Sequence, residues 1–175
     1  MVSASPLRLV FWGTPEFAVP TLDALLHSRH SVVGVVTRQD RARGRGQRVG
    51  VTPVKERALA AGIPVIEPER LSDPWLLAAL KDLDADLGIV AAYGKILSET
   101  ILAMPRLGLI NVHASLLPRY RGAAPIHRAV IAGERETGVT IMRMVKALDA
   151  GPMLAIARRA IGPNETSGDL ERALS

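Results

Sequence analysis

Short apolar runs alternate with segments of helical periodicity along almost the whole chain, and this alternation limits the possible folds more than any other feature. The runs that we expect to form strands are residues 7–12, 32–37, 64–66, 87–92, 107–112, 139–145 and 153–161. The segments that we expect to form helices are residues 16–28, 52–62, 72–83, 98–104, 122–132 and a last one from 166 onward. Strands that alternate with helices are typical of an α/β protein. We therefore predict a doubly wound, mainly parallel sheet with flanking helices.

The composition indicates a single globular domain with an aliphatic core. Of the 175 residues 48% are hydrophobic, but only two each are Trp, Tyr and Phe, so Leu, Val, Ile and Ala must fill most of the interior. The chain has no Cys, which excludes disulfides, thiolate metal sites and cysteine nucleophiles. No uncharged apolar run approaches the ~20 residues that a bilayer span needs. We expect a cytoplasmic monomer that makes no contact with a membrane.

The positive charge of the chain is concentrated in one strip. The whole chain has 22 Lys and Arg against 17 Asp and Glu, and the segment from Arg38 to Arg57 alone holds seven bases and two acids. We expect the strip to form a loop, because Gly44, Gly46 and Gly50 interrupt any periodicity. Arginines spaced by Gly and Ala favour contact with nucleic-acid phosphates over a merely solvated loop. The candidate RNA-binding residues are Arg41, Arg43, Arg45 and Arg48.

Polar side chains close the otherwise apolar strand expected at 107–112. Asn111 and His113 are two residues apart, so in an extended chain their side chains lie on one face. Asp149 follows the next expected strand, and in a parallel sheet the two strand ends can be neighbours. The carboxylate could then orient the imidazole, while the Asn111 amide donates to a developing oxyanion. The alternative is a structural His in the core and an Asp that merely favours a turn.

Three other kinds of site are disfavoured. The turn after the first expected strand, residues 13–16 (GTPE), is neither a dinucleotide-binding fingerprint nor a Walker A loop. Ser115 lacks the G-x-S-x-G surroundings that expose the nucleophile of a hydrolase. The other histidines show no zinc-binding spacing, so we expect no metal site. They are His27, His30 and His127.

Several segments resemble the folate-dependent formyltransferases. They are residues 11–18 (FWGTPEFA), 92–97 (AYGKIL), 104–106 (MPR), 110–126 (INVHASLLPRYRGAAPI), 137–142 (TGVTIM) and 148–154 (LDAGPML). The match runs in order across nearly the whole chain, and it is strongest to the members that act on methionyl initiator tRNA. The resemblance implies a Rossmann-like catalytic domain, which we assign to residues 1–175 and expect to be incomplete at its C-terminal end. It also implies a C-terminal β-barrel domain in the family, which we do not expect within residues 1–175.

The resemblance further implies a reaction and a set of site residues. The donor would be 10-formyltetrahydrofolate, with no metal, and the acceptor the α-amino group of methionyl initiator tRNA, for translation initiation. The family's catalytic Asn, His and Asp fall on Asn111, His113 and Asp149. Its folate-lining residues fall on Ser115, Leu116, Leu117 and Pro118. Its basic loop, which approaches the tRNA acceptor arm, falls on the region from Arg41 to Arg48.

One departure from the family's sequence leaves a second kind of acceptor possible. Ala147 stands where the family usually has Gly, and the preceding Met144, Val145 and Lys146 are similar to the formyltransferase domain that acts on an amino-sugar nucleotide. A third possibility is an inactive folate- or RNA-binding fragment. The arginine strip favours tRNA among these acceptors, because a small sugar acceptor gives no reason for so local an excess of positive charge.

Overall fold

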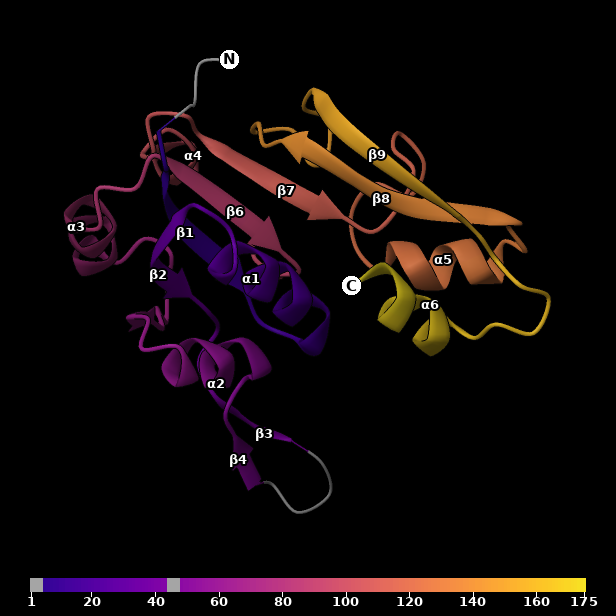
Figure 1. The fold of residues 1–175 in the computed structure, drawn as a ribbon, viewed down its shortest axis with the longest axis horizontal. Coiled ribbons are helices and arrows are strands. Elements are labelled where there is room, and N and C mark those ends of the chain that lie inside the picture. The colour runs from indigo at the N-terminus through magenta and orange to yellow at the C-terminus, as the bar shows by residue number, and fades with distance from the viewer. Residues whose placement is uncertain (1–4, 44–47) are drawn as a thin grey trace.

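The computed structural model describes residues 5–43 and 48–175 and contains a seven-stranded sheet in the order β5-β2-β1-β6-β7-β8-β9 (Figure 1). The strands are β1 (Arg8–Gly13), β2 (Ser31–Val36), β5 (Val65–Ile66), β6 (Leu87–Ala91), β7 (Leu109–His113), β8 (Glu136–Arg143) and β9 (Met153–Ala160). The five strands from β5 to β7 pair in parallel, whereas β8 is antiparallel to β7 and β9 is antiparallel to β8. The prediction of a mainly parallel sheet is confirmed.

Helices cover both faces of this sheet. They are η1 (Glu16–Ala18), α1 (Val19–Leu26), α2 (Pro53–Ala60), α3 (Pro74–Asp82), α4 (Glu99–Leu102), α5 (Pro125–Ile131) and α6 (Ser167–Leu174). One buried cluster joins α1 and α2 to the sheet through Leu22 and Val54. Another joins α3 and α4 to the opposite face through Leu76 and Ile101. Together the two clusters give the doubly wound arrangement that the alternating pattern predicts.

Local signals explain where the helices begin. Thr52 caps α2, because its Oγ1 accepts a hydrogen bond of 3.3 Å from the backbone N–H of Lys55. Pro53 follows in the first helical turn, where no N–H is needed. The helix expected at 16–28 is divided into η1 and α1, with Pro20 in the first turn of α1. Within the described ranges, no helix combines the length and the hydrophobicity that a membrane crossing requires.

The arginine strip forms a hairpin, and the expectation of a loop is wrong. Strands β3 (Arg41–Arg43) and β4 (Arg48–Gly50) pair in antiparallel register and extend beyond α2, away from the sheet (Figure 1). Glycine does not prevent such pairing, because the hydrogen bonds come from backbone groups. The backbone therefore places three of the four candidate arginines on this hairpin, and Arg45 lies outside the described residues.

Candidate active site

Strand β7 presents Asn111 and His113 on one face, as their spacing predicts. Both side chains line a cavity of about 640 Å³. The cavity lies beside the carboxyl ends of β6 and β7, which is where open parallel sheets commonly bind ligands. The His113 side chain is buried, with only 7% of its surface exposed.

Asp149 approaches β7 by a different route from the one expected. Strand β8 is antiparallel, and its last residue, Arg143, pairs with Ile110. The connection from β8 to β9 then returns across the face of β7, and a hydrogen bond of 2.9 Å from the Arg143 N–H to the Pro152 carbonyl closes it. Asp149 has a left-handed backbone (φ 45°) in this connection, a conformation that Asp adopts more readily than most residues. The prediction of neighbouring parallel strand ends is therefore wrong, although the predicted proximity is present.

The three candidate catalytic side chains meet at one point. The Asn111 Nδ2 donates a long hydrogen bond of 3.4 Å to Asp149 Oδ1. The His113 Nδ1 lies 3.6 Å from Asp149 Oδ2, at the distance of an ion pair when the ring is protonated. The backbone N–H of Gly122 also donates to Asp149 Oδ2, at 2.8 Å. The carboxylate is thus fixed by contacts from three sides and is itself only 9% exposed.

The other ring nitrogen of His113 faces a backbone carbonyl. Its Nε2 lies 3.0 Å from the oxygen of Tyr120, and a carbonyl oxygen only accepts, so this nitrogen carries a hydrogen. The sequence gives no sign of this contact, because Tyr120 contributes its backbone and not its side chain.

The segment from Ser115 to Pro118 takes no part in the cavity wall in the described part of the chain. Ser115 is fully buried, and its Oγ donates to the Arg119 carbonyl at 2.7 Å. Thr140 Oγ1 donates to the Ser115 carbonyl at 2.7 Å and accepts from the Leu117 N–H at 3.2 Å. These bonds hold the segment that follows β7 and occupy the Ser115 hydroxyl, which disfavours a hydrolase nucleophile. Contact of Ser115, Leu116, Leu117 and Pro118 with a folate stays a prediction.

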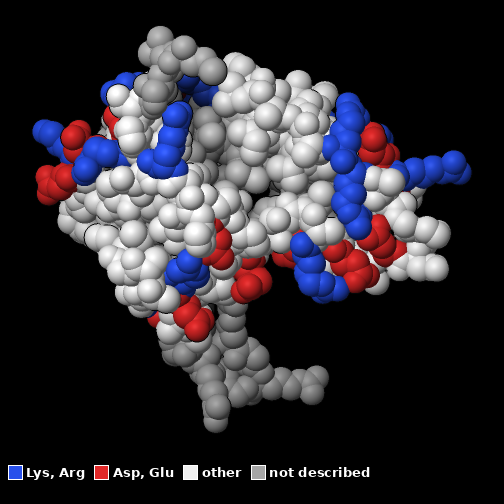
Figure 2. Space-filling view, viewed as in Figure 1, with Lys and Arg blue, Asp and Glu red and all other residues white. Residues whose placement is uncertain are grey.

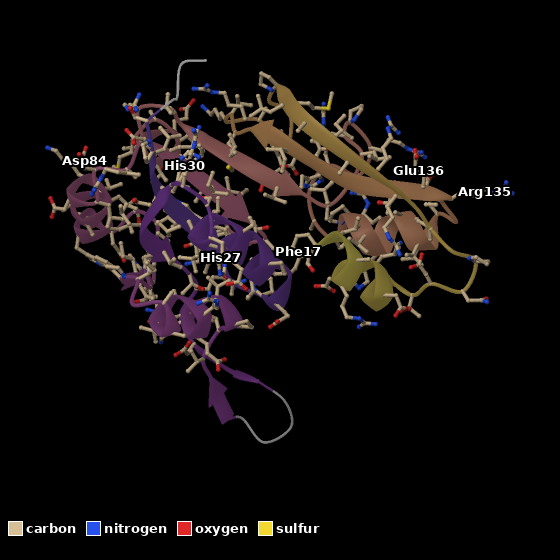
Figure 3. All side chains as sticks on the ribbon, in the orientation of Figure 1. Phe17, His27, His30, Asp84, Arg135 and Glu136 are labelled. Carbon is tan, nitrogen blue, oxygen red and sulfur yellow. The ribbon has the colours of Figure 1, made fainter. Side chains whose placement is uncertain are left out.

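Side chains outside the predicted site form much of the cavity wall. Val90, Leu97 and Met142 line it from the central strands and the segment after β6. Phe17 lines it from η1 (Figure 3) and packs with Leu170 of α6 in a buried cluster. Sequence reasoning did not identify these residues as lining a cavity, because their residue types are those of any apolar core. The cavity therefore combines apolar walls with the Asn111, His113 and Asp149 group, and charged side chains, among them Lys95, Lys146 and Glu171, also line it.

Two buried aromatic residues pack against each other beside the cavity. The rings of Trp12 and Tyr93 meet edge to face, with centroids 5.3 Å apart. Burial raises the pKa of Tyr93 to about 12, so its hydroxyl stays neutral. Neither the Trp12 Nε1 nor the Tyr93 hydroxyl has a hydrogen-bond partner among the described residues. Tyr93 also lines the cavity, so this part of the cavity wall is predominantly apolar.

Comparison with protein families gives one match, to the family described as "Formyl transferase", over residues 7–175. Curated relatives named methionyl-tRNA formyltransferase include that of Pseudomonas syringae pv. syringae, which is 54% identical over 170 residues, with coverage of 97% of this chain and 54% of the relative. The relative of Methylococcus capsulatus is 51% identical over 169 residues, with coverage of 97% and 55%. The chain thus spans about half the length of the curated relatives that it matches.

Solved structures share the fold. Glycinamide ribonucleotide transformylase 1 from Symbiobacterium toebii aligns with a TM-score of 0.81 at 21% identity and covers 98% of this chain and 82% of its own. The protein of the same name from Geobacillus kaustophilus gives 0.78 at 26% identity, with coverage of 97% and 90%. A formyltetrahydrofolate deformylase from Pseudomonas syringae pv. tomato gives 0.76 at 21% identity, with coverage of 98% and 57%.

Proposed function

Because the chain belongs to the formyl transferase family, we propose that it transfers a formyl group from 10-formyltetrahydrofolate to the α-amino group of methionyl initiator tRNA. The observation that carries this proposal is the meeting of Asn111, His113 and Asp149 at the wall of one cavity. The names of the curated relatives support the choice of acceptor. We place the reaction in the cytoplasm, where initiator tRNA is used.

The cavity fits a donor of folate size. A volume of about 640 Å³ falls within the usual range of 300–1,000 Å³ for small-molecule sites. Apolar side chains such as Leu97 and Met142 supply walls for a flat heterocycle, and the polar group marks the position of the reacting carbon. The donor supplies an activated formyl group when bound, and the protein orients it and excludes water.

Asn111 and His113 are suited to stabilise the charge that develops on the formyl oxygen. The Asn111 amide has two N–H groups, of which one faces Asp149 and the other is free to donate to this oxygen. The Nε2 of His113 faces the Tyr120 carbonyl, so we assign Nδ1, which lies 3.6 Å from Asp149 Oδ2, as the second donor to this oxygen when the ring is protonated. Asp149 therefore acts by orienting the imidazole ring.

The transfer balances without a covalent bond to the protein. The unprotonated amine nitrogen forms a bond to the formyl carbon, and the bond from that carbon to N10 of the donor breaks. The proton that the amine loses is delivered to N10, through His113 or through a water molecule. We assign no metal to this reaction.

The distribution of charge supports a polyanionic acceptor. Acidic and basic side chains of the described residues lie close together on the face seen in Figure 2, which is viewed as in Figure 1. The excess of positive charge belongs to the strip from Arg38 to Arg57, whose hairpin extends beyond α2. We assign the hairpin to contact with tRNA phosphates, because such contacts are made by clustered Arg and Lys side chains.

Replacing Arg41, Arg43, Arg45 and Arg48 together by Ala tests this assignment. We expect weaker binding of initiator tRNA and a log–log salt slope reduced by about 3, since four phosphate contacts are removed. The measurement is fluorescence anisotropy at several salt concentrations. The matched control replaces four exposed arginines elsewhere, namely Arg29, Arg70, Arg135 and Arg158. If both variants lose the same affinity, total charge explains the binding and the hairpin has no special role.

A paired assay tests the acceptor. The protein is incubated with 10-formyltetrahydrofolate and either methionyl initiator tRNA or an amino-sugar nucleotide, and donor binding is measured in parallel by calorimetry. We expect formylation of the tRNA and none of the sugar. If only the amino-sugar nucleotide is formylated, the proposed acceptor is wrong and the sugar takes its place. If the donor binds and neither acceptor is formylated, the chain is a folate-binding module.

A further inference from the structure

Glu134, in the connection between α5 and β8, anchors two neighbouring side chains of the segment after β7. Its carboxylate accepts a hydrogen bond from the Tyr120 hydroxyl. It also accepts from both terminal nitrogens of Arg119, at 2.9 Å for the Nη1–Oε2 pair. Only 16% of the Glu134 side chain is exposed, so these bonds form in a partly desolvated place, where hydrogen bonds to a charged group are strong.

Tyr120 connects this anchor to the candidate catalytic His. Its side chain is bonded to Glu134, while its backbone carbonyl receives the hydrogen bond from His113 Nε2 at 3.0 Å. The residue has a left-handed backbone (φ 57°), which is strained for a side chain of this size. Such a conformation persists when surrounding contacts hold it, and the Glu134 bond is the hydrogen bond that the Tyr120 side chain makes in the described part of the chain.

The flanking residues are fixed by separate bonds. On one side, the Arg119 carbonyl accepts from the buried Ser115 Oγ at 2.7 Å. On the other side, the Gly122 N–H donates to Asp149 at 2.8 Å. One short segment thus contacts both members of the His–Asp pair, through the carbonyl of Tyr120 and the N–H of Gly122. The position of this segment sets the orientation of the His113 ring relative to the Asp149 carboxylate.

We propose that Glu134 is a positioning residue, which holds Tyr120 so that its carbonyl fixes the His113 ring with Nδ1 toward Asp149. The inference rests on the proposed function, in which His113 acts on the formyl group. Glu134 does not line the cavity formed by the described residues, so it acts through Tyr120 and not on the substrates. Sequence reasoning missed it because Glu134 is separated from His113 by 21 positions and shows no motif with it.

The charges around Tyr120 favour the same arrangement. The hydrogen bond to the Glu134 carboxylate raises the pKa of Tyr120, so the hydroxyl remains a donor. The guanidinium groups of Arg119 and Arg128 lie 5.5 and 5.3 Å from the centroid of the Tyr120 ring, within the range of cation–π attraction. The neutral amide of a Glu134→Gln variant still accepts from the Tyr120 hydroxyl, which makes this variant a conservative replacement.

The test compares Glu134→Ala, Glu134→Gln and a control, Glu136→Ala. Glu136 pairs with Arg158 at the exposed start of β8 and lies away from Phe17 (Figure 3), and it is not among the described residues that line the cavity. For Glu134→Ala we expect kcat to fall by about 10- to 100-fold with little change in the KM of the donor, because a misplaced catalytic group affects the chemical step. We expect Glu134→Gln to recover most of this loss and Glu136→Ala to match the unmodified protein.

Nitrogen-15 NMR of the histidine rings gives a readout that does not depend on turnover. The His113 signals are assigned with His113→Ala, and the protein without substrates is expected to show a slowly exchanging Nε2 hydrogen. In Glu134→Ala this hydrogen should exchange faster and the ring shifts should change. In Glu134→Gln both should return toward those of the unmodified protein. Tyr120→Phe removes only the hydroxyl bond and should change the ring signals in the same direction, which keeps the test valid if Glu134→Ala does not fold.

The outcomes separate this inference from the proposed function. If Glu134→Ala folds and keeps both the His113 ring spectrum and the kcat of the control, the positioning role is wrong. If the unmodified protein formylates no acceptor, the proposed function fails, whereas the ring spectra still decide whether Glu134 orients His113. A loss of kcat with unchanged ring signals would also overturn the inference, because the effect would then bypass His113.

Discussion

Replacing Asn111 or His113 by Ala is expected to lower the turnover of methionyl-tRNA formylation by about 100- to 1000-fold, the usual loss when one donor to an oxyanion is removed. In the proposed mechanism each residue supplies a hydrogen bond that strengthens as charge moves onto the formyl oxygen, so the loss should fall on kcat and not on substrate binding. The measurement is initial rate at saturating donor and tRNA. The double variant should lose less than the product of the two single losses, since both residues serve one site.

Matched controls for these variants exist on the surface. Asn164 and His27 are exposed and lie outside the cavity lining, so Asn164→Ala and His27→Ala should keep normal turnover. Circular dichroism must show that Asn111→Ala and His113→Ala remain folded, because His113 is buried. Near-normal turnover of either folded variant at saturating substrates would contradict the catalytic assignment.

A Gly151→Ala substitution is expected to destabilise the protein by about 3 kcal/mol, at the upper end of the range for overpacking. A Cβ atom at Gly151 would lie 1.8 Å from the backbone carbonyl oxygen of Arg143, and backbone cannot move aside as a side chain can. The same Arg143 closes the β8–β9 connection through its bond to Pro152. The clash should therefore also displace Asp149, two residues earlier, and lower turnover in whatever fraction remains folded.

Urea unfolding gives the free energy that this prediction requires. Gly50→Ala is the control, because a Cβ atom at Gly50 meets no atom of the described residues within 4 Å, and its effect should stay within about 0.5 kcal/mol. A Gly151→Ala protein as stable as the control would mean that the β8–β9 connection can relax. Asp149 would then depend less on the path of this backbone than the structure indicates.

Much of the fold follows from local patterns, but the direction of the last strands does not. The apolar runs and the capping residues Thr52 and Pro53 identify elements, because propensity and periodicity act within a few residues. Whether β8 runs parallel or antiparallel to β7 depends on how the chain packs after α5, which no short pattern encodes. The alternating burial of β8 is typical of an antiparallel strand.

The residues of the candidate site likewise fall into those that the sequence could identify and those that it could not. Asn111 and His113 could be paired from their spacing, because a strand puts alternate side chains on one face. The carbonyl of Tyr120 and the N–H of Gly122 could not be found in this way, since every residue has these groups and only the path of the chain selects them. Glu134 was missed for a related reason, because its contacts are with residues that are distant from it in the sequence.

The location of the arginine hairpin has a consequence for how such a chain diversifies. Strands β3 and β4 extend beyond α2 and take no part in the seven-stranded sheet (Figure 1), whereas the Asn–His–Asp group is built on β7 and the β8–β9 connection. Insertions or deletions in the hairpin leave the sheet intact, because no core strand pairs with it. One scaffold can therefore gain or lose an appendage for a large acceptor and keep the same transfer chemistry, so that acceptor size can evolve separately from the reaction.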